Sequence, residues 1–245
     1  MTSALTRVLV TGGASGIGRA TVERLRQDGV AVGVVDRDAG RLADTDADVS
    51  AVADVSSEEE LGQAVRDIAQ ALGGLDGLVA CAGMAGRGTV ATTEPSDWDR
   101  LFAVNVRGVY LSARAVIPHL REAGGGAIVF VASQLGLVAA ANAAAYCASK
   151  GAVVQLARAM AIDHAGEGIR VNAVCPGPTE TPLLGEYLQA AEDPADERRR
   201  YEEAQLHRRM VAPEEIAEGI AYLLSPGAAS TLGHALVVDG GYTIY

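Results

Sequence analysis

Short apolar runs rich in β-branched residues alternate along the chain with longer segments whose apolar positions recur at helical spacing. The apolar runs predict strands over residues 7–11, 31–36, 49–54, 77–80, 127–132, 170–175 and 236–238. The longer segments predict helices over residues 17–27, 57–71, 96–120, 144–165 and 213–224. Strands that are apolar almost throughout and are separated by helices are typical of a parallel sheet covered on both faces. The pattern therefore predicts an α/β fold, a doubly wound parallel sheet of the Rossmann type.

Residues 177–212 interrupt this alternation. The segment is polar, contains Pro178, Pro182 and Pro194, and includes the charged run DPADERRRYEEAQLHRR. A long insertion after a late strand often covers a site at the carboxyl ends of the strands, so we expect a lid. No linker or internal repeat divides the chain, and residues 1–245 are expected to form a single domain.

Composition and charge narrow the class of function. The chain has 245 residues, of which 49% are hydrophobic and 4% aromatic, so its core is expected to be aliphatic. A formal net charge of −11 disfavours nucleic acid as a partner, because the average surface repels a polyanion. Cys81, Cys147 and Cys175 lie far apart without a ligand motif, which predicts neither a disulfide framework nor a metal site.

No membrane partner is expected either. Residues 124–149 carry no charge, but Ser133, Gln134 and Asn142 are poorly suited to a membrane-spanning helix. We interpret the stretch as a buried strand, a loop and the start of a helix. The first residues lack a basic region followed by an apolar one, so no signal peptide is predicted and a cytoplasmic location is expected.

The sequence VLVTGGASGIGRA joins the first predicted strand to the first predicted helix. Gly12, Gly16 and Gly18 are spaced G-x-x-x-G-x-G, which suits a tight turn and a close approach of the backbone to a pyrophosphate. Backbone amides at the start of the helix would then point at the anion. A simple connecting turn is the alternative interpretation of the same glycines.

Acidic residues follow the second and third predicted strands. Asp36 ends the second strand about 20 residues after the glycines, where a carboxylate binds the ribose hydroxyls of NAD and repels the extra phosphate of NADP. Arg37 could instead pair with that phosphate, but the favoured cofactor is NAD. Asp54 is expected either to contact the adenine or to cap the next helix.

Tyr146 and Lys150 are four residues apart on a predicted helix, so their side chains share one face. Lys150 is the only lysine in the chain, and apart from the histidines all other basic residues are arginines. A free tyrosine has a pKa near 10, and a nearby ammonium group is expected to lower that pKa toward neutrality. A tyrosine activated in this way can act as a general acid or base, although the same spacing also arises by chance.

Together these features resemble the classical short-chain dehydrogenase/reductases over residues 5–242. The resemblance rests on TGGASGIG, Asp36, Asn105, Ser133, YCASK, PGPTET and the closing VDGG. It implies that Tyr146 is the catalytic acid/base and that Lys150 binds the nicotinamide ribose and lowers the tyrosine pKa. It further implies that Ser133 orients the substrate oxygen and that Asn105 holds a water in a proton relay; a buried asparagine with a structural role is the alternative for Asn105.

The resemblance also implies a set of cofactor contacts. The expected set is Gly12, Ser15, Gly16, Ile17, Gly18, Asp36, Arg37, Asp54, Val55, Ala82, Gly83, Tyr146, Lys150, Pro176, Gly177, Thr179 and Thr181. One departure is Cys81, which stands in Cys81-Ala82-Gly83 where the family usually has asparagine. Backbone contacts from Ala82 and Gly83 are expected to persist, and Cys81 is expected to be a small buried residue without chemistry.

The predicted reaction is reversible hydride transfer between a secondary alcohol and NAD⁺, without a metal. The alternatives are a ketone or 3-oxoacyl reductase that uses NAD(P)H, and a non-catalytic NAD-binding sensor. The resemblance implies a homotetramer, and the substrate is expected to be a small alcohol or ketone.

An apolar substrate pocket is expected around Ser133. Its predicted lining is Leu135, Leu137, Val138, Leu183, Leu184 and Tyr187, with Gln134 as a polar group. The arginine-rich part of the lid could indicate an anionic substrate. However, Asp196–Arg200, Arg198–Glu202 and Arg199–Glu203 have the i,i+4 spacing of ion pairs on a solvated helix, which is the favoured interpretation.

Overall fold

The computed structural model describes residues 5–244, and residues 1–4 and 245 of the predicted domain lie outside it. Its strands are β1 (Arg7–Thr11), β2 (Ala31–Asp36), β3 (Val49–Val52), β4 (Gly77–Ala80), β5 (Gly126–Val131), β6 (Ile169–Pro176) and β7 (Ala235–Val238). They form one parallel sheet in the order β3-β2-β1-β4-β5-β6-β7, which confirms the predicted fold class. The direction in which the chain adds strands reverses between β1 and β4, where sites of this architecture form.

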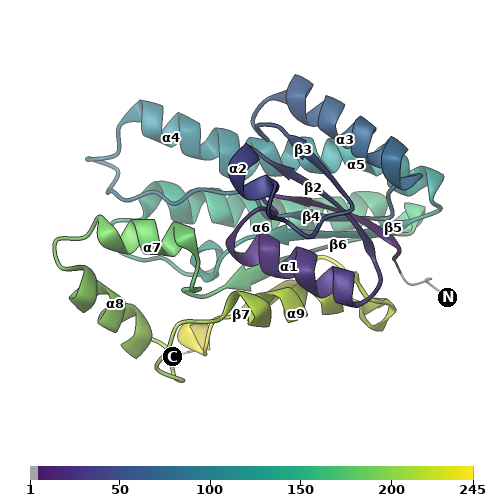
Figure 1. Ribbon diagram of the computed structural model, residues 1–245. Helices are drawn as coiled ribbons and strands as arrows, with labels where there is room; N and C mark the ends of the chain where they lie inside the picture. The colour runs from purple at the N-terminus through teal and green to yellow at the C-terminus, as the bar shows by residue number, and fades with distance from the viewer. Residues whose placement is uncertain (1–4, 245) are drawn as a thin grey trace.

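Helices cover both faces of the sheet (Figure 1). They are α1 (Gly16–Gln27), α2 (Ala39–Leu42), α3 (Glu58–Leu72), α4 (Pro95–Phe102), α5 (Gly108–Glu122), α6 (Ala144–His164), α7 (Pro182–Gln189), α8 (Pro194–Glu203) and α9 (Pro213–Leu224). Side chains of β1 alternate between the two layers: Leu9 packs with α3, α5 and α6, whereas Val8 and Val10 pack with α1 and α9. Phe130, on β5, is fully buried in the first of these layers, and burial of one such side chain contributes about 1.5–3 kcal/mol.

The predicted single helix over residues 96–120 is wrong. Helix α4 ends at Phe102, one π-helical turn spans Ala103–Arg107, and α5 begins at Gly108. The π turn contains Asn105, whose side chain is fully buried. The predicted end of the third strand at residue 54 is also wrong, because β3 ends at Val52, while the other strand ends agree within a residue.

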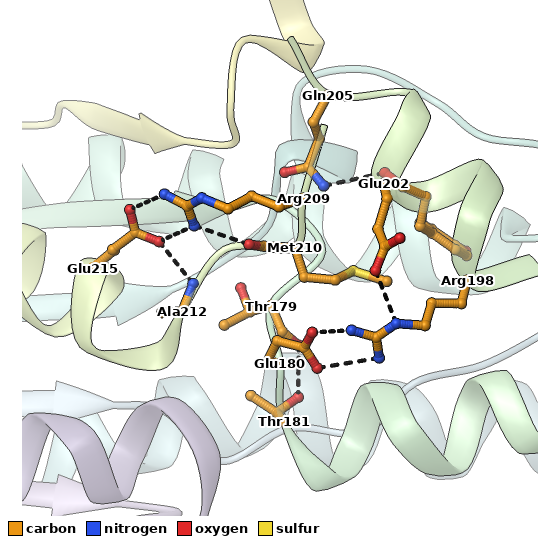
Figure 2. A network of polar contacts seen from close by, with 11 residues as sticks. Thr179, Glu180, Thr181, Arg198, Glu202, Gln205, Arg209, Met210, Ala212 and Glu215 are labelled. Carbon is orange, nitrogen blue, oxygen red and sulfur yellow. Dashed lines mark hydrogen bonds and ion pairs between the residues drawn. The ribbon is translucent and has the colours of Figure 1, made fainter. Parts of the chain in front are cut away.

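The expected lid is a closed loop that carries α7 and α8. Its two ends meet at a bridge between Thr179 and Val211, where Glu180 N donates to Val211 O at 3.0 Å and Val211 N donates to Pro178 O at 2.9 Å. Just beyond this bridge, the guanidinium of Arg209 donates to both carboxylate oxygens of Glu215 at 2.7 Å (Figure 2). These contacts fix the stem of the lid to α9.

Arginines of α8 are neutralised within the lid. Arg198 pairs with Glu202 at 2.8 Å and also with Glu180 at the stem (Figure 2). Arg200 pairs with Asp196 at 2.9 Å, as predicted. The predicted Arg199–Glu203 pair is wrong, because Arg199 binds Asp196 instead.

No helix among residues 5–244 combines the length and apolar character needed to cross a bilayer.

Candidate active site

The carboxyl ends of the strands open into a cleft of about 450 Å³. Its walls come from the loops after β1, β2, β4, β5 and β6, the start of α6 and the lid. The predicted site residues that line it are Gly12, Ser15, Gly16, Ile17, Asp36, Arg37, Asp54, Val55, Ala82, Gly83, Ser133, Tyr146, Lys150, Pro176, Gly177, Thr179 and Thr181. Gly18 and Asn105 do not line the cleft. Both contact the loops that form its wall.

The glycine loop after β1 packs so closely against neighbouring backbone that side chains do not fit at Gly12 and Gly18. Gly12 has φ +69°, and a Cβ there would lie 2.6 Å from Ala82 Cα in the loop after β4. At Gly18, a Cβ would lie 2.1 Å from Gly12 O, so this glycine allows α1 to begin directly against the turn. These contacts explain why Gly18 lies outside the cleft: it packs against the loop on the side away from the cleft.

The start of α1 is built to receive an anion. Ser15 is the residue before the helix, and its side chain makes no capping hydrogen bond. The first turn of α1 contains no acidic residue, so the free backbone amides and the helix dipole are available to a negative group. The cradle therefore fits the pyrophosphate of a dinucleotide cofactor.

Asp36 connects β2 to the glycine loop. Its Oδ2 accepts a hydrogen bond from Ala14 N at 3.1 Å, and its Oδ1 accepts one from Asp38 N at 3.0 Å. An ionised carboxylate has about four acceptor positions, so capacity remains for ribose hydroxyls. Arg37 and Arg41 line the same end of the cleft, and Arg41 pairs with Asp38 at 3.3 Å.

Asp54 has a local structural role. Its Oδ1 accepts hydrogen bonds from Ser56 Oγ at 2.7 Å and from Ser56 N at 2.8 Å, which lower the pKa of its carboxyl. The alternative in which Asp54 caps the next helix is wrong, because Ser57 caps α3. Contact between Asp54 and an adenine stays a prediction.

Tyr146, Lys150 and Ser133 converge beside the glycine loop. Lys150 Nζ lies 5.7 Å from the centroid of the Tyr146 ring, one turn away on α6. The lysine side chain is 5% exposed and donates to Val131 O, at the end of β5, at 2.9 Å. Ser133 follows β5, and its hydroxyl accepts a hydrogen bond from Leu135 N at 3.1 Å. The same hydroxyl is near enough to Tyr146 to exert a lowering effect on the tyrosine pKa.

Burial controls the protonation of this group. It raises the pKa of Tyr146 to about 12, and the effect of the Ser133 hydroxyl offsets only part of the rise. The expectation that Lys150 lowers the Tyr146 pKa toward neutrality is therefore wrong for the protein without cofactor. Burial also lowers the pKa of Lys150 to about 8, so the amine is mainly an ammonium at neutral pH. The site holds a neutral phenol beside a cation.

Asn105 braces the loop after β4. Its Oδ1 accepts from Met84 N at 2.8 Å, and its Nδ2 donates to Met84 O at 2.9 Å and to Ser149 Oγ at 3.2 Å. Its side chain thus fastens the wall of the cleft to α6. The predicted role in holding a water stays a prediction.

Cys81 follows β4 and lines the cleft, so the expectation that it is fully buried is wrong. Its backbone N donates to Thr11 O at 3.1 Å, which preserves the link between β1 and the loop after β4. Burial raises the pKa of its thiol to about 12, so the thiolate is not formed at neutral pH.

The substrate end of the cleft is mostly apolar. Leu135, Leu183, Leu184 and Tyr187 line it as predicted, together with Gln134. The predicted contribution of Leu137 and Val138 is wrong, because both side chains lie outside the cleft and are exposed.

Sequence reasoning missed Tyr201 of α8, which also lines the cleft. Its ring meets Tyr187 edge to face, with 6.3 Å between centroids. Arg87 stacks on Tyr187 at 4.3 Å and donates to Glu197 at 3.2 Å, and these contacts join the lid to the loop after β4. No residue pattern signals a contact between elements so far apart in the chain. Among the described residues, no group of three or more metal-ligating side chains forms a metal site.

Comparison with known proteins agrees with this architecture. Residues 12–243 match the family described as enoyl-(acyl carrier protein) reductase. The 2-(S)-hydroxypropyl-CoM dehydrogenase 3 of Xanthobacter autotrophicus is 39% identical over 96% of each chain. The inactive 2-(S)-hydroxypropyl-CoM dehydrogenase 2 of that organism is 42% identical over 88% of this chain and 96% of its own. The structure of 3-ketoacyl-(acyl-carrier-protein) reductase from Brucella melitensis complexed with NADH is 34% identical, with a TM-score of 0.89, and covers 97% of this chain and 98% of that one.

Proposed function

The chain belongs to the classical short-chain dehydrogenase/reductase family, and from this premise we propose that it is an NAD-dependent dehydrogenase that interconverts a secondary alcohol and a ketone. The observation that carries the proposal is the convergence of Ser133, Tyr146 and Lys150 beside a glycine cradle shaped for a pyrophosphate. Bound NAD⁺ supplies the hydride acceptor in this chemistry.

The members of the site have different tasks in the proposed reaction. Tyr146 takes the hydroxyl proton of the alcohol during oxidation and returns it during reduction. Ser133 orients the substrate oxygen through its hydroxyl. The ammonium of Lys150 binds the nicotinamide ribose and favours the phenolate once the alcohol is in place. Asn105 holds the wall of the cleft through its bonds to Met84.

The preference for NAD over NADP rests on Asp36. Its carboxylate lies at the end of β2 and lines the cleft, where it would repel a 2′-phosphate. Arg37 and Arg41 are close by, but Arg41 is paired with Asp38. We expect at least tenfold higher kcat/KM with NAD⁺ than with NADP⁺ for the same alcohol. Equal values would refute the assignment.

A screen of secondary alcohols with NAD⁺, followed by absorbance of the reduced cofactor, tests the reaction itself. Tyr146→Phe is expected to lower turnover by several orders of magnitude while NADH binding persists, because the ring stays and only the proton-transferring hydroxyl is lost. NADH binding without turnover of any alcohol in a broad panel would favour the non-catalytic sensor alternative. This outcome is worth testing because one relative is named as inactive.

Reduction of a ketone or a 3-oxoacyl group is the second candidate activity. The high pKa of Tyr146 favours it, because a neutral phenol is the form that donates a proton to a carbonyl. A comparison of ketone reduction with NADH and NADPH distinguishes it from the first proposal.

A homotetramer is proposed from family membership. Trp98, Tyr110 and Ile162 are exposed apolar side chains on α4, α5 and α6, and pairing of these helices between subunits would cover them. Light scattering measures the mass directly. The proposed location is the cytoplasm, which cell fractionation tests.

A further inference from the structure

Gln134 is a buried amide at the substrate end of the cleft. It follows Ser133 in the short turn after β5, lines the cleft and is only 4% exposed. Its Oε1 has no hydrogen-bond partner among the described residues. An acceptor buried without a partner costs about 1–3 kcal/mol, so its presence in a ligand cleft points to a partner that arrives with the ligand.

The surrounding backbone makes room for this amide. A Cβ at position 177 would lie 3.0 Å from Gln134 Oε1, tighter than ordinary contact, and residue 177 is glycine. The amide therefore lies between Ser133, which holds the reacting oxygen in the proposed function, and the first residues of the lid. Ser133 and Gln134 both line the cleft, so one ligand that spans the two side chains would contact both.

The charges around the substrate end favour a neutral ligand. Arg87, the nearest lid-facing arginine, is stacked on Tyr187 and paired with Glu197 outside the cleft. Lys150 belongs to the catalytic group, and Glu186 adds a carboxylate to the lining. An anionic substrate would find no arginine of the described chain lining this end of the cleft.

We propose that Gln134 is a specificity-determining residue that binds a second hydroxyl group of a neutral vicinal diol, beside the carbinol held by Ser133 and Tyr146. The proposal rests on the dehydrogenase function proposed above. A hydroxyl fits because it can donate to Oε1 and can equally accept from Nε2 if the terminal amide turns over. A ketone or ether oxygen could only accept.

The test compares two substrates with the same ring: cyclohexane-1,2-diol, as separate cis and trans isomers, and cyclohexanol. We expect the wild-type protein to have a higher kcat/KM for one diol isomer than for cyclohexanol. Gln134→Leu is expected to reduce that ratio about tenfold, because it keeps the volume and removes the hydrogen bond. Gln134→Glu is expected to retain more of the ratio than Gln134→Leu, since a carboxylate still accepts from a hydroxyl.

Gln205 provides a matched control. It is 1% exposed, and its Oε1 also lacks a partner among residues 5–244. It follows α8 in the lid (Figure 2) and is not among the residues that line the cleft. Gln205→Leu is expected to leave the diol-to-cyclohexanol ratio at its wild-type value, even if it alters stability.

Three results would overturn the inference. One is a wild-type preference for cyclohexanol over both diols. Another is an unchanged ratio in Gln134→Leu. The third is a loss of NADH affinity in Gln134→Leu, measured by fluorescence titration, together with an equal fall in kcat/KM for both substrates. That result would make Gln134 a cofactor contact. Failure of the wild-type protein to oxidise any alcohol in the screen would instead refute the proposed function.

Discussion

Replacement of Lys150 by methionine is expected to abolish catalysis and yet stabilise the protein without cofactor. The pKa of Lys150 falls from 10.5 to about 8 because burial penalises the ammonium. Each pKa unit corresponds to about 1.4 kcal/mol, so the buried charge costs about 3 kcal/mol at neutral pH. Methionine has a similar volume and no charge, but it loses the hydrogen bond to Val131 O, worth about 1 kcal/mol. The expected net gain in the free energy of unfolding is about 2 kcal/mol.

The pH dependence of this gain identifies its cause. Below pH 8 the ammonium is present in both folded and unfolded wild-type protein, so the whole penalty applies. Between pH 8 and 10.5 the unfolded chain binds more protons at Lys150 than the folded one, and wild-type stability rises relative to the variant. The advantage of Lys150→Met should therefore shrink as the pH rises from 7 to 10.

Denaturant unfolding of both proteins at one fixed protein concentration, at pH 7 and at pH 10, measures these differences. Arg66→Met on the exposed face of α3 also removes one positive charge and should change stability by less than about 0.5 kcal/mol. A Lys150→Met variant that is less stable than wild type at pH 7 would refute the reasoning. So would a difference that stays constant up to pH 10.

Two further predictions concern the glycine loop and the catalytic phenol. Gly18→Ala is expected to weaken NADH binding more than tenfold and to destabilise the fold by about 1–3 kcal/mol, because the new Cβ would lie 2.1 Å from Gly12 O. Gly166→Ala is the control, since a Cβ there would have no atom within 4 Å. Equal NADH affinities for the two variants would contradict this prediction. In the protein without cofactor, Tyr146 is expected to stay un-ionised below pH 10, since burial raises its pKa to about 12. The difference in ultraviolet absorbance between wild type and Tyr146→Phe measures the phenolate. A phenolate transition below pH 9 would be inconsistent with the effect of burial. The same shift implies that the stability contributed by the buried phenol is complete below pH 10 and is lost between pH 10 and about 12.

Most of the sheet could be predicted because each strand is a short apolar run with its own turn signals. The strands from Arg7 to Thr11 and from Ala31 to Asp36 form as expected, and the glycine loop and Asp36 follow from their position at strand ends. The π turn could not be predicted, because residues 96–120 keep one helical pattern throughout. Its position coincides with the hydrogen bonds of Asn105 to Met84, contacts that exist only when the β4 loop and this helix are packed together.

The electrostatics of the catalytic pair show most clearly where sequence reasoning stops. The four-residue spacing correctly places Lys150 beside Tyr146, and by Coulomb attraction alone the ammonium would lower the phenol pKa. Burial depends on the whole fold, because Lys150 lies against the end of β5 and the loop after β4, whereas Tyr146 lies near Tyr187 of the lid. It raises the pKa of Tyr146 and lowers that of Lys150, which favours the uncharged form of each side chain. A lysine whose pKa is about 8 is still largely charged at pH 7, yet it can release its proton with little cost. An arginine in the same place would stay charged at any working pH and would bear the full cost of burial. The site therefore needs a lysine, because its ammonium is charged at pH 7 but can still lose its proton near that pH. The buried charge lowers the stability of the fold.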